Sequence, residues 1–122
     1  MKITKIFFHL INLVFLIFYL YPGSILGFLL YGNFKKQPQI SPDFYFSSNH
    51  VYAFAALTLF GLISHINKKN IIIYFIFLSF ILELSHLIIP NRSFQFEDIF
   101  GNIIGILISI LLIKIYNYLR KK

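Results

Sequence analysis

Two ionisable residues, Glu83 and His86, lie within a long apolar run of the sequence. They are three residues apart, so on a helix they share one face. An ionisable side chain inside an apolar segment is costly and commonly marks a functional site. A carboxyl and an imidazole at this spacing can transfer a proton, bind a ligand, or join two helices by a hydrogen bond. The residue types alone leave these three roles open.

Other polar residues occur at the ends of the neighbouring apolar runs. His50 opens one run, Arg92 lies in a short polar connection, and Asp98 and Asn102 are one turn apart at the start of the last run. Arg92 can clamp a phosphate or carboxylate, whereas Asp98 suits the positive end of a helix dipole. We therefore predict a ligand-binding pocket near the outer membrane surface, formed by six residues: His50, Glu83, His86, Arg92, Asp98 and Asn102.

Metal binding and nucleophilic catalysis are less favoured interpretations of these residues. His50, Glu83 and His86 offer two imidazoles and a carboxylate, which is a common ligand set, but a di-iron bundle needs several more carboxylates. The sequence has no cysteine, no serine-nucleophile motif and no glycine-rich phosphate loop. We predict no metal and no cofactor.

Four apolar runs must position these residues. Their lengths are close to the ~20 residues of a membrane-spanning helix, and they lack the two-residue alternation of a membrane β-strand. We predict an all-α fold, a bundle of four transmembrane helices in a single domain of residues 1–122. The helices are expected at about residues 6–21, 49–66, 71–89 and 96–116.

Breaks between the runs follow helix-stopping residues. Pro22 and Gly23 end the first run, and Pro90 ends the third. The semi-apolar stretch 24–31 is expected at the membrane interface. Residues 32–48 form the long outer loop.

Composition excludes a soluble or disordered protein. The 122 residues are 58% hydrophobic and 12% charged, whereas a soluble domain carries about 25% charged residues. Disorder requires low hydrophobicity. The formal charge of +7 comes from basic residues at the ends of apolar runs, where they act as topology signals. We therefore expect no nucleic-acid partner.

The distribution of basic residues predicts the orientation. Cytoplasmic segments carry an excess of Lys and Arg. Both termini are therefore expected in the cytoplasm, and the N-terminal run is expected to be retained as a helix, since no small-residue cleavage site follows it. Eight basic residues lie on the side of the termini: Lys2, Lys5, Lys68, Lys69, Lys114, Arg120, Lys121 and Lys122. Three lie on the other side: Lys35, Lys36 and Arg92.

Two further patterns concern packing. Gly101 and Gly105 form a GxxxG motif, which lets helix backbones approach closely in lipid. Tyrosines near the ends of the runs are expected in aromatic belts at the membrane interfaces. These are Tyr19, Tyr21, Tyr31, Tyr116 and Tyr118.

The segment 83–105 resembles the signature of the VanZ-like family. That signature reads Glu-x-x-Gln, then a Pro and an Arg, then Asp-x-x-x-Asn-x-x-Gly. Its positions correspond here to Glu83, Arg92, Asp98, Asn102 and Gly105, and His50 matches a His that opens the second helix of the family. Two departures stand out. His86 occupies the place of the usual Gln, and residues 47–49 replace the Asp-Lys that commonly precedes the His.

The resemblance implies a small multi-pass protein of the bacterial inner membrane, in a family named for a protein linked to teicoplanin resistance. Our leading hypothesis is the binding of an amphipathic anionic molecule, a lipid or a lipid-linked cell-envelope precursor, in the outer pocket. One alternative is an enzyme acting on a lipid head group, with Glu83 and His86 or His50 as acid and base. Another is a structural accessory subunit, whose polar cluster joins helices.

Overall fold

The computed structural model describes residues 2–65 and 67–122, and this part of the chain is all-helical, without a strand. Four of its helices correspond to the four predicted runs. The remaining one, α2, occupies the stretch expected at the membrane interface. In chain order the helices are α1 (Lys2–Leu20), α2 (Ile25–Tyr31), α3 (Ser48–Ser64), α4 (Lys68–Ser85) and α5 (Phe96–Arg120).

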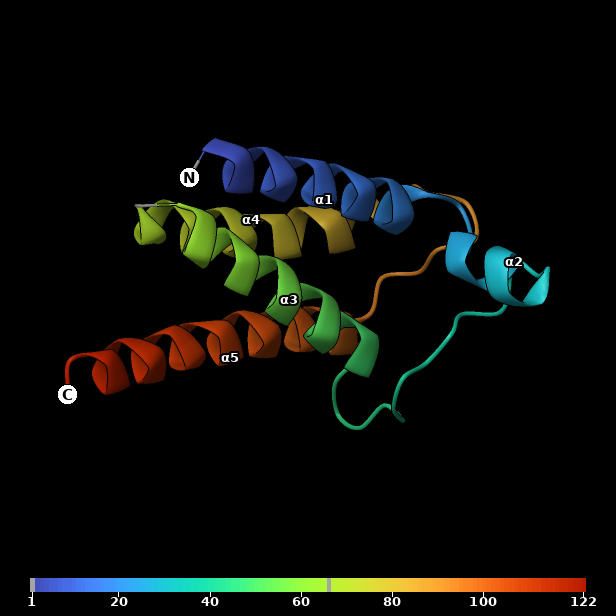
Figure 1. The fold of residues 1–122 in the computed structure, drawn as a ribbon. Coiled ribbons are helices and arrows are strands. Elements are labelled where there is room, and N and C mark those ends of the chain that lie inside the picture. The colour runs from blue at the N-terminus through green and yellow to red at the C-terminus, as the bar shows by residue number, and fades with distance from the viewer. Residues whose placement is uncertain (1, 66) are drawn as a thin grey trace.

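Helix α3 is the centre of the arrangement. It packs against α1, α4 and α5, and α1 and α4 lie side by side above it in Figure 1. The core lies where these four helices meet. It includes Phe8 of α1, Phe54 of α3, Phe75 of α4 and Ile106 of α5, each at most 2% exposed.

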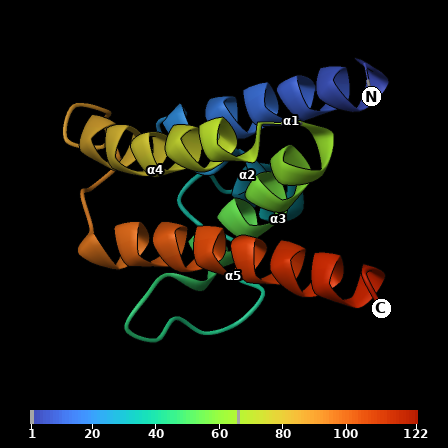
Figure 2. The same cartoon turned by 90° about the vertical axis from the view of Figure 1, so that its left-hand side faces the viewer.

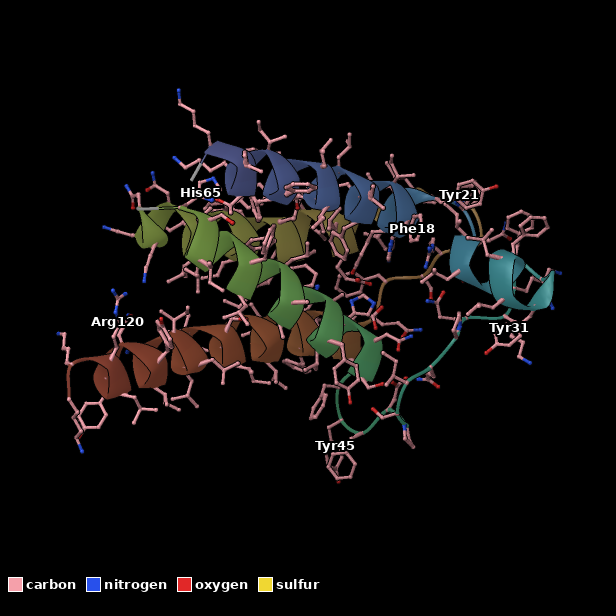
Figure 3. All side chains as sticks on the ribbon, viewed as in Figure 1. Phe18, Tyr21, Tyr31, Tyr45, His65 and Arg120 are labelled. Atoms are coloured by element: carbon pink, nitrogen blue, oxygen red, sulfur yellow. The ribbon has the colours of Figure 1, made fainter. Side chains whose placement is uncertain are left out.

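Both chain ends and the α3–α4 turn lie at one end of the bundle, while α2 and the α4–α5 connection lie at the other (Figure 1). The view in Figure 2 again separates the two termini from the α4–α5 connection. Figure 3 places His65 and Arg120 near the first end, and Tyr31 and Tyr45 near the second. The four predicted pocket segments therefore share one end of the molecule.

Several helix ends differ from the predicted boundaries. Helix α1 begins at Lys2, before the apolar run, because helix propagation does not require apolar residues once a turn has formed. Helix α3 ends at Ser64, and the predicted end at Ile66 lies outside the described residues. Helix α5 continues to Arg120, a basic residue that suits the negative end of the helix dipole.

Helix α4 ends at Ser85, before the end predicted near Ile89. The N–H of His86 donates to the carbonyl of Glu83 at 3.1 Å, which begins a tighter turn. Pro90 disfavours helical geometry at Ile89, the residue before it. The chain must therefore leave the helix before it reaches the proline.

Helix α2 is short and well capped. The hydroxyl of Ser24 accepts a hydrogen bond from the N–H of Gly27 at 2.9 Å, which is the usual N-cap arrangement. Gly32 follows the helix with φ of +66°, a conformation that glycine adopts without steric cost. The stretch 24–31 is therefore mostly helix rather than irregular chain.

Helices α3 and α5 approach closely at two glycines. A Cβ atom on Gly101 would lie 2.5 Å from the carbonyl oxygen of Ser47. A Cβ atom on Gly105 would lie 2.6 Å from the carbonyl oxygen of Val51 and 2.8 Å from the nitrogen of Ala55. Only glycine fits at such backbone contacts, so these residues set the rotation of α5 against α3.

The surface of the helices is apolar. By length and composition α1 and α5 can each cross a membrane, and α3 is a shorter apolar helix. Of the most apolar 18-residue stretch of each helix, only 17% is buried in α1 and 33% in α5. A soluble protein rarely exposes such extended apolar surface. This surface indicates a membrane protein.

Candidate functional site

A buried polar network lies at the end of the bundle opposite the termini. It joins the end of α1, the start of α3, the end of α4 and the start of α5. Five of the six predicted pocket residues take part, whereas the hydrogen bonds of Arg92 go to backbone carbonyls near the end of α1. The members are Tyr19, His50, Glu83, His86, Asp98 and Asn102.

Glu83 is fully buried and held from two sides. The hydroxyl of Tyr19 donates to its Oε2 at 2.8 Å. The backbone N–H of Gln95, in the α4–α5 connection, donates to its Oε1 at 2.9 Å. Because α4 ends at Ser85, Glu83 is in the last turn of its helix, about 3 Å along the axis from that end. The helix end expected near Ile89 would have placed Glu83 further from the end of its helix.

His86 continues this contact on the same side of Glu83. Its Nδ1 lies 3.4 Å from Oε1 of Glu83, and its Nε2 lies 3.2 Å from the backbone carbonyl of Tyr19. The imidazole also stacks on the Tyr19 ring, with centroids 4.7 Å apart and planes 17° from parallel. Both ring nitrogens face acceptors, and a neutral imidazole donates to one of them.

His50 connects α3 to α1 and α5. Its Nδ1 lies 2.8 Å from Oδ1 of Asn102 and 3.1 Å from the Tyr19 hydroxyl. Its Nε2 lies 3.5 Å from Oδ2 of Asp98. The proton of the Tyr19 hydroxyl goes to Glu83, and Oδ1 of Asn102 is an acceptor, so the hydrogen of His50 is on Nδ1.

Asp98 and Asn102 differ in exposure. The side chain of Asp98 is 14% exposed and that of His50 17%, so both reach the edge of the network. Asn102 is fully buried, and its Nδ2 has no hydrogen-bond acceptor among the described residues. A buried donor without an acceptor is costly. The site therefore has a buried amide donor to offer a ligand.

Arg92 faces backbone carbonyls at the end of α1. Its Nε donates to Tyr21 at 3.0 Å, and one Nη donates to Phe18 at 3.1 Å and to Gly23 at 2.6 Å. Figure 3 labels Phe18 and Tyr21 where α1 approaches α2. A cation suits the negative end of a helix. Partial burial lowers the pKa of Arg92 below its ordinary value, because desolvation disfavours the charged form.

Tyr19 is the central residue that sequence reasoning placed wrongly. It was expected in an aromatic belt, but it is 8% exposed and touches Glu83, His50 and His86. A signal existed, since Tyr19 shares the buried face of α1 with Phe8 at helical spacing. The contribution of Gln95 is a backbone N–H, which leaves no signature in a sequence.

Among residues 2–65 and 67–122, one set of side chains could hold a metal ion, and it differs from the predicted set of His50, Glu83 and His86. His50, Glu83 and Asp98 each offer a ligand atom, and these atoms lie within 4.8 Å of one another. Asp98 stands in this set in place of His86, whose nitrogens face Oε1 of Glu83 and the carbonyl of Tyr19.

Comparison with known proteins gives one result. A family model described as VanZ/LLP1 matches residues 3–117, nearly the whole chain. Searches of the curated proteins and of the solved structures found no match.

Proposed function

The chain belongs to the VanZ/LLP1 family, and on this premise we propose that it is a multi-pass protein of the bacterial cytoplasmic membrane that binds an amphipathic molecule. Helices α1, α3, α4 and α5 cross the bilayer as a single domain, and α2 lies at the outer interface. Both termini lie in the cytoplasm, on the side with eight basic residues against three. The polar network then lies in the outer leaflet.

The observation that carries the proposal is the unpartnered amide of Asn102. Its Nδ2 is fully buried and lacks an acceptor among the described residues. Native proteins rarely leave such a donor unsatisfied, so an oxygen atom of a ligand or a water is expected beside it. Asp98 and His50 form the half-buried edge through which a polar head group enters.

An apolar groove along the helix that carries Asp98 accommodates the rest of an amphipathic molecule. The groove has a volume of about 640 Å³ and lies along the first turns of α5, against Phe80 of α4 and Phe46 of the long loop. Ile99 and Ile103 line it, and each directly follows a residue of the polar network in the sequence. Head group and acyl chain thus have adjoining sites on one helix. The ligand we propose is a membrane lipid or a lipid-linked cell-envelope precursor.

Native mass spectrometry of the protein released gently from its own membranes tests this proposal. Wild type should retain a defined lipid, whereas Asp98→Asn and Ile104→Trp should lose it, because the first alters the polar edge and the second fills the groove. Glu97→Gln and Leu107→Trp are matched controls, since both residues are exposed and neither lines the groove. Equal lipid retention in all five proteins would refute the proposal, and so would labelling that places residues 90–97 in the cytoplasm.

An enzyme acting on a lipid head group is the second candidate, favoured by the position of His50. Its Nε2 lies 3.5 Å from Asp98 at the half-buried edge, where a base can reach a head group. This candidate predicts product formation that His50→Gln abolishes in a folded protein. A structural accessory role predicts instead that Glu83→Gln only lowers the amount of folded protein.

The proposed link to glycopeptide resistance rests on the family alone. It predicts that cells expressing the chain become less susceptible to teicoplanin, and that Asp98→Asn removes this effect while leaving expression unchanged. Susceptibility that is identical with and without the chain would remove resistance from the proposed function.

A further inference from the structure

We propose that His50, Glu83 and Asp98 bind a divalent transition-metal ion, with zinc the best match to the donors. One imidazole and two carboxylates form a three-ligand set of the kind that leaves a fourth position open in zinc sites. The inference departs from the sequence-based expectation of no metal. It deepens the proposed function. The metal site itself does not depend on that function, whereas the contact between the ion and a lipid head group rests on it.

The spacing of the donors suits a metal better than a direct hydrogen bond. Nε2 of His50 and Oδ2 of Asp98 are 3.5 Å apart, beyond the 2.7–3.2 Å typical of such a hydrogen bond. With metal–ligand bonds of about 2.0–2.1 Å, two ligands of a tetrahedral ion lie about 3.3–3.4 Å apart. One ligand atom of each of His50, Glu83 and Asp98 lies within 4.8 Å of the other two, so a small shift brings the Glu83 carboxylate to the ion.

The tautomer of His50 leaves the required lone pair. Nδ1 donates to Oδ1 of Asn102 at 2.8 Å, so Nε2 of the neutral ring carries no hydrogen and faces Asp98. Metal-binding histidines almost always donate their other ring N–H in this way, which fixes the orientation of the ring. Asn102 thus acts as a positioning residue for the metal ligand.

Glu83 keeps one oxygen with capacity for an ion. Oε1 accepts from the N–H of Gln95 and faces His86, whereas Oε2 accepts only from the Tyr19 hydroxyl. A carboxylate oxygen that receives one hydrogen bond retains a lone pair. The three donors around Glu83 match the outer shell that holds metal-binding carboxylates in place.

Charge balance also favours a cation between the carboxylates. Among the described residues, neither Glu83 nor Asp98 forms an ion pair with a Lys or Arg. The nearby Arg92 donates to backbone carbonyls instead. A divalent ion compensates both charges, and it lets an anionic head group approach two carboxylates that would otherwise repel it.

The site is open on one side. The side chains of His50 and Asp98 are 17% and 14% exposed, while that of Glu83 is fully buried. An ion enters at the His50–Asp98 edge and keeps its fourth position toward that edge. Asn102, whose Nδ2 lacks an acceptor among the described residues, contacts His50 at the opposite ring nitrogen, Nδ1.

The test is metal binding by the full chain in detergent, purified without a histidine tag, stripped with a chelator and reloaded with Zn²⁺ alone. Elemental analysis should find about one zinc per wild-type chain, and Co²⁺ loading should give a tetrahedral d–d absorption spectrum. We expect His50→Gln and Asp98→Asn each to raise the dissociation constant for zinc at least ~100-fold. Asn102→Ala should raise the dissociation constant for zinc ~10–100-fold, because losing a hydrogen-bond partner of a metal ligand lowers metal affinity by this factor. Glu97→Gln, one residue from Asp98, should bind zinc like wild type.

The outcomes separate this inference from the proposed function. Folded wild type that binds no zinc, or His50→Gln and Asp98→Asn variants that bind it as tightly as wild type, would overturn the metal site. Two variants in different helices keep the test valid if one fails to fold. Ile104→Trp should keep zinc while losing lipid. If wild type binds no zinc but still retains a lipid that Ile104→Trp removes, the metal site is refuted and the lipid site is supported.

Discussion

Replacing Tyr19 by Phe removes one hydroxyl from the centre of the polar network. That hydroxyl donates to Oε2 of Glu83 at 2.8 Å and lies 3.1 Å from Nδ1 of His50. The Phe ring keeps the shape of the side chain and can still stack on His86. The substitution therefore tests the hydrogen bonds and leaves the packing in place.

The expected loss of stability is about 1.5 kcal/mol. Interhelical hydrogen bonds in membranes average ~0.6 kcal/mol and reach ~1.7 kcal/mol, whereas hydrogen bonds to charged groups contribute ~1.5–3 kcal/mol. Glu83 is fully buried and receives only two other donors, so the upper part of the membrane range applies. This loss changes the ratio of folded to unfolded protein about tenfold.

Steric trapping in bicelles measures this free energy of unfolding. Tyr21→Phe is the matched control, because Tyr21 is 37% exposed and its hydroxyl has no partner among the contacts of the described residues. A double-mutant cycle with Glu83→Gln should give a coupling of at least ~1 kcal/mol between Tyr19 and Glu83. The reasoning fails if Tyr19→Phe costs no more than Tyr21→Phe, or if the coupling is near zero.

Three further predictions concern the contacts that hold this end of the bundle. Gly105→Ala should lower the free energy of unfolding by about 1–3 kcal/mol, because its Cβ would lie 2.6 Å from the Val51 carbonyl; thermal unfolding without a shift would contradict the close approach of α3 and α5. Arg92→Lys should lower the free energy of unfolding by about 1–2 kcal/mol and expose residues 86–95 to limited proteolysis. Lys keeps the charge but lacks the planar guanidinium that contacts three carbonyls. Unchanged cleavage would argue against a role of these contacts in holding residues 86–95. Ser109→Ala should lower the free energy of unfolding by about 0.5–1 kcal/mol, since the Ser109 hydroxyl donates to the Ala55 carbonyl at 2.6 Å. Steric trapping measures this change, and an unchanged free energy would show that the hydrogen bond does not stabilise the fold.

The helical class, the approximate helices and the end of the molecule where the polar residues meet could all be predicted from the amino-acid sequence. These features depend on local properties. Apolar runs near the length of a bilayer indicate helices, and Pro22 and Pro90 break the chain between them. Once the helices alternate in direction, His50, Glu83 and Asp98 must come to the same end, which the structure shows.

Which atoms face one another at that end depends on how the helices pack. The rotation of each helix about its axis depends on packing, here on the contact of Gly105 with α3. Sequence reasoning therefore missed the burial of Tyr19, and it did not reveal that Arg92 faces the carbonyls of α1. The predicted end of the third helix near residue 89 was wrong because α4 ends at Ser85, where a tighter turn precedes Pro90. A side chain's partners come from other helices, and no local pattern in the sequence encodes that rotation.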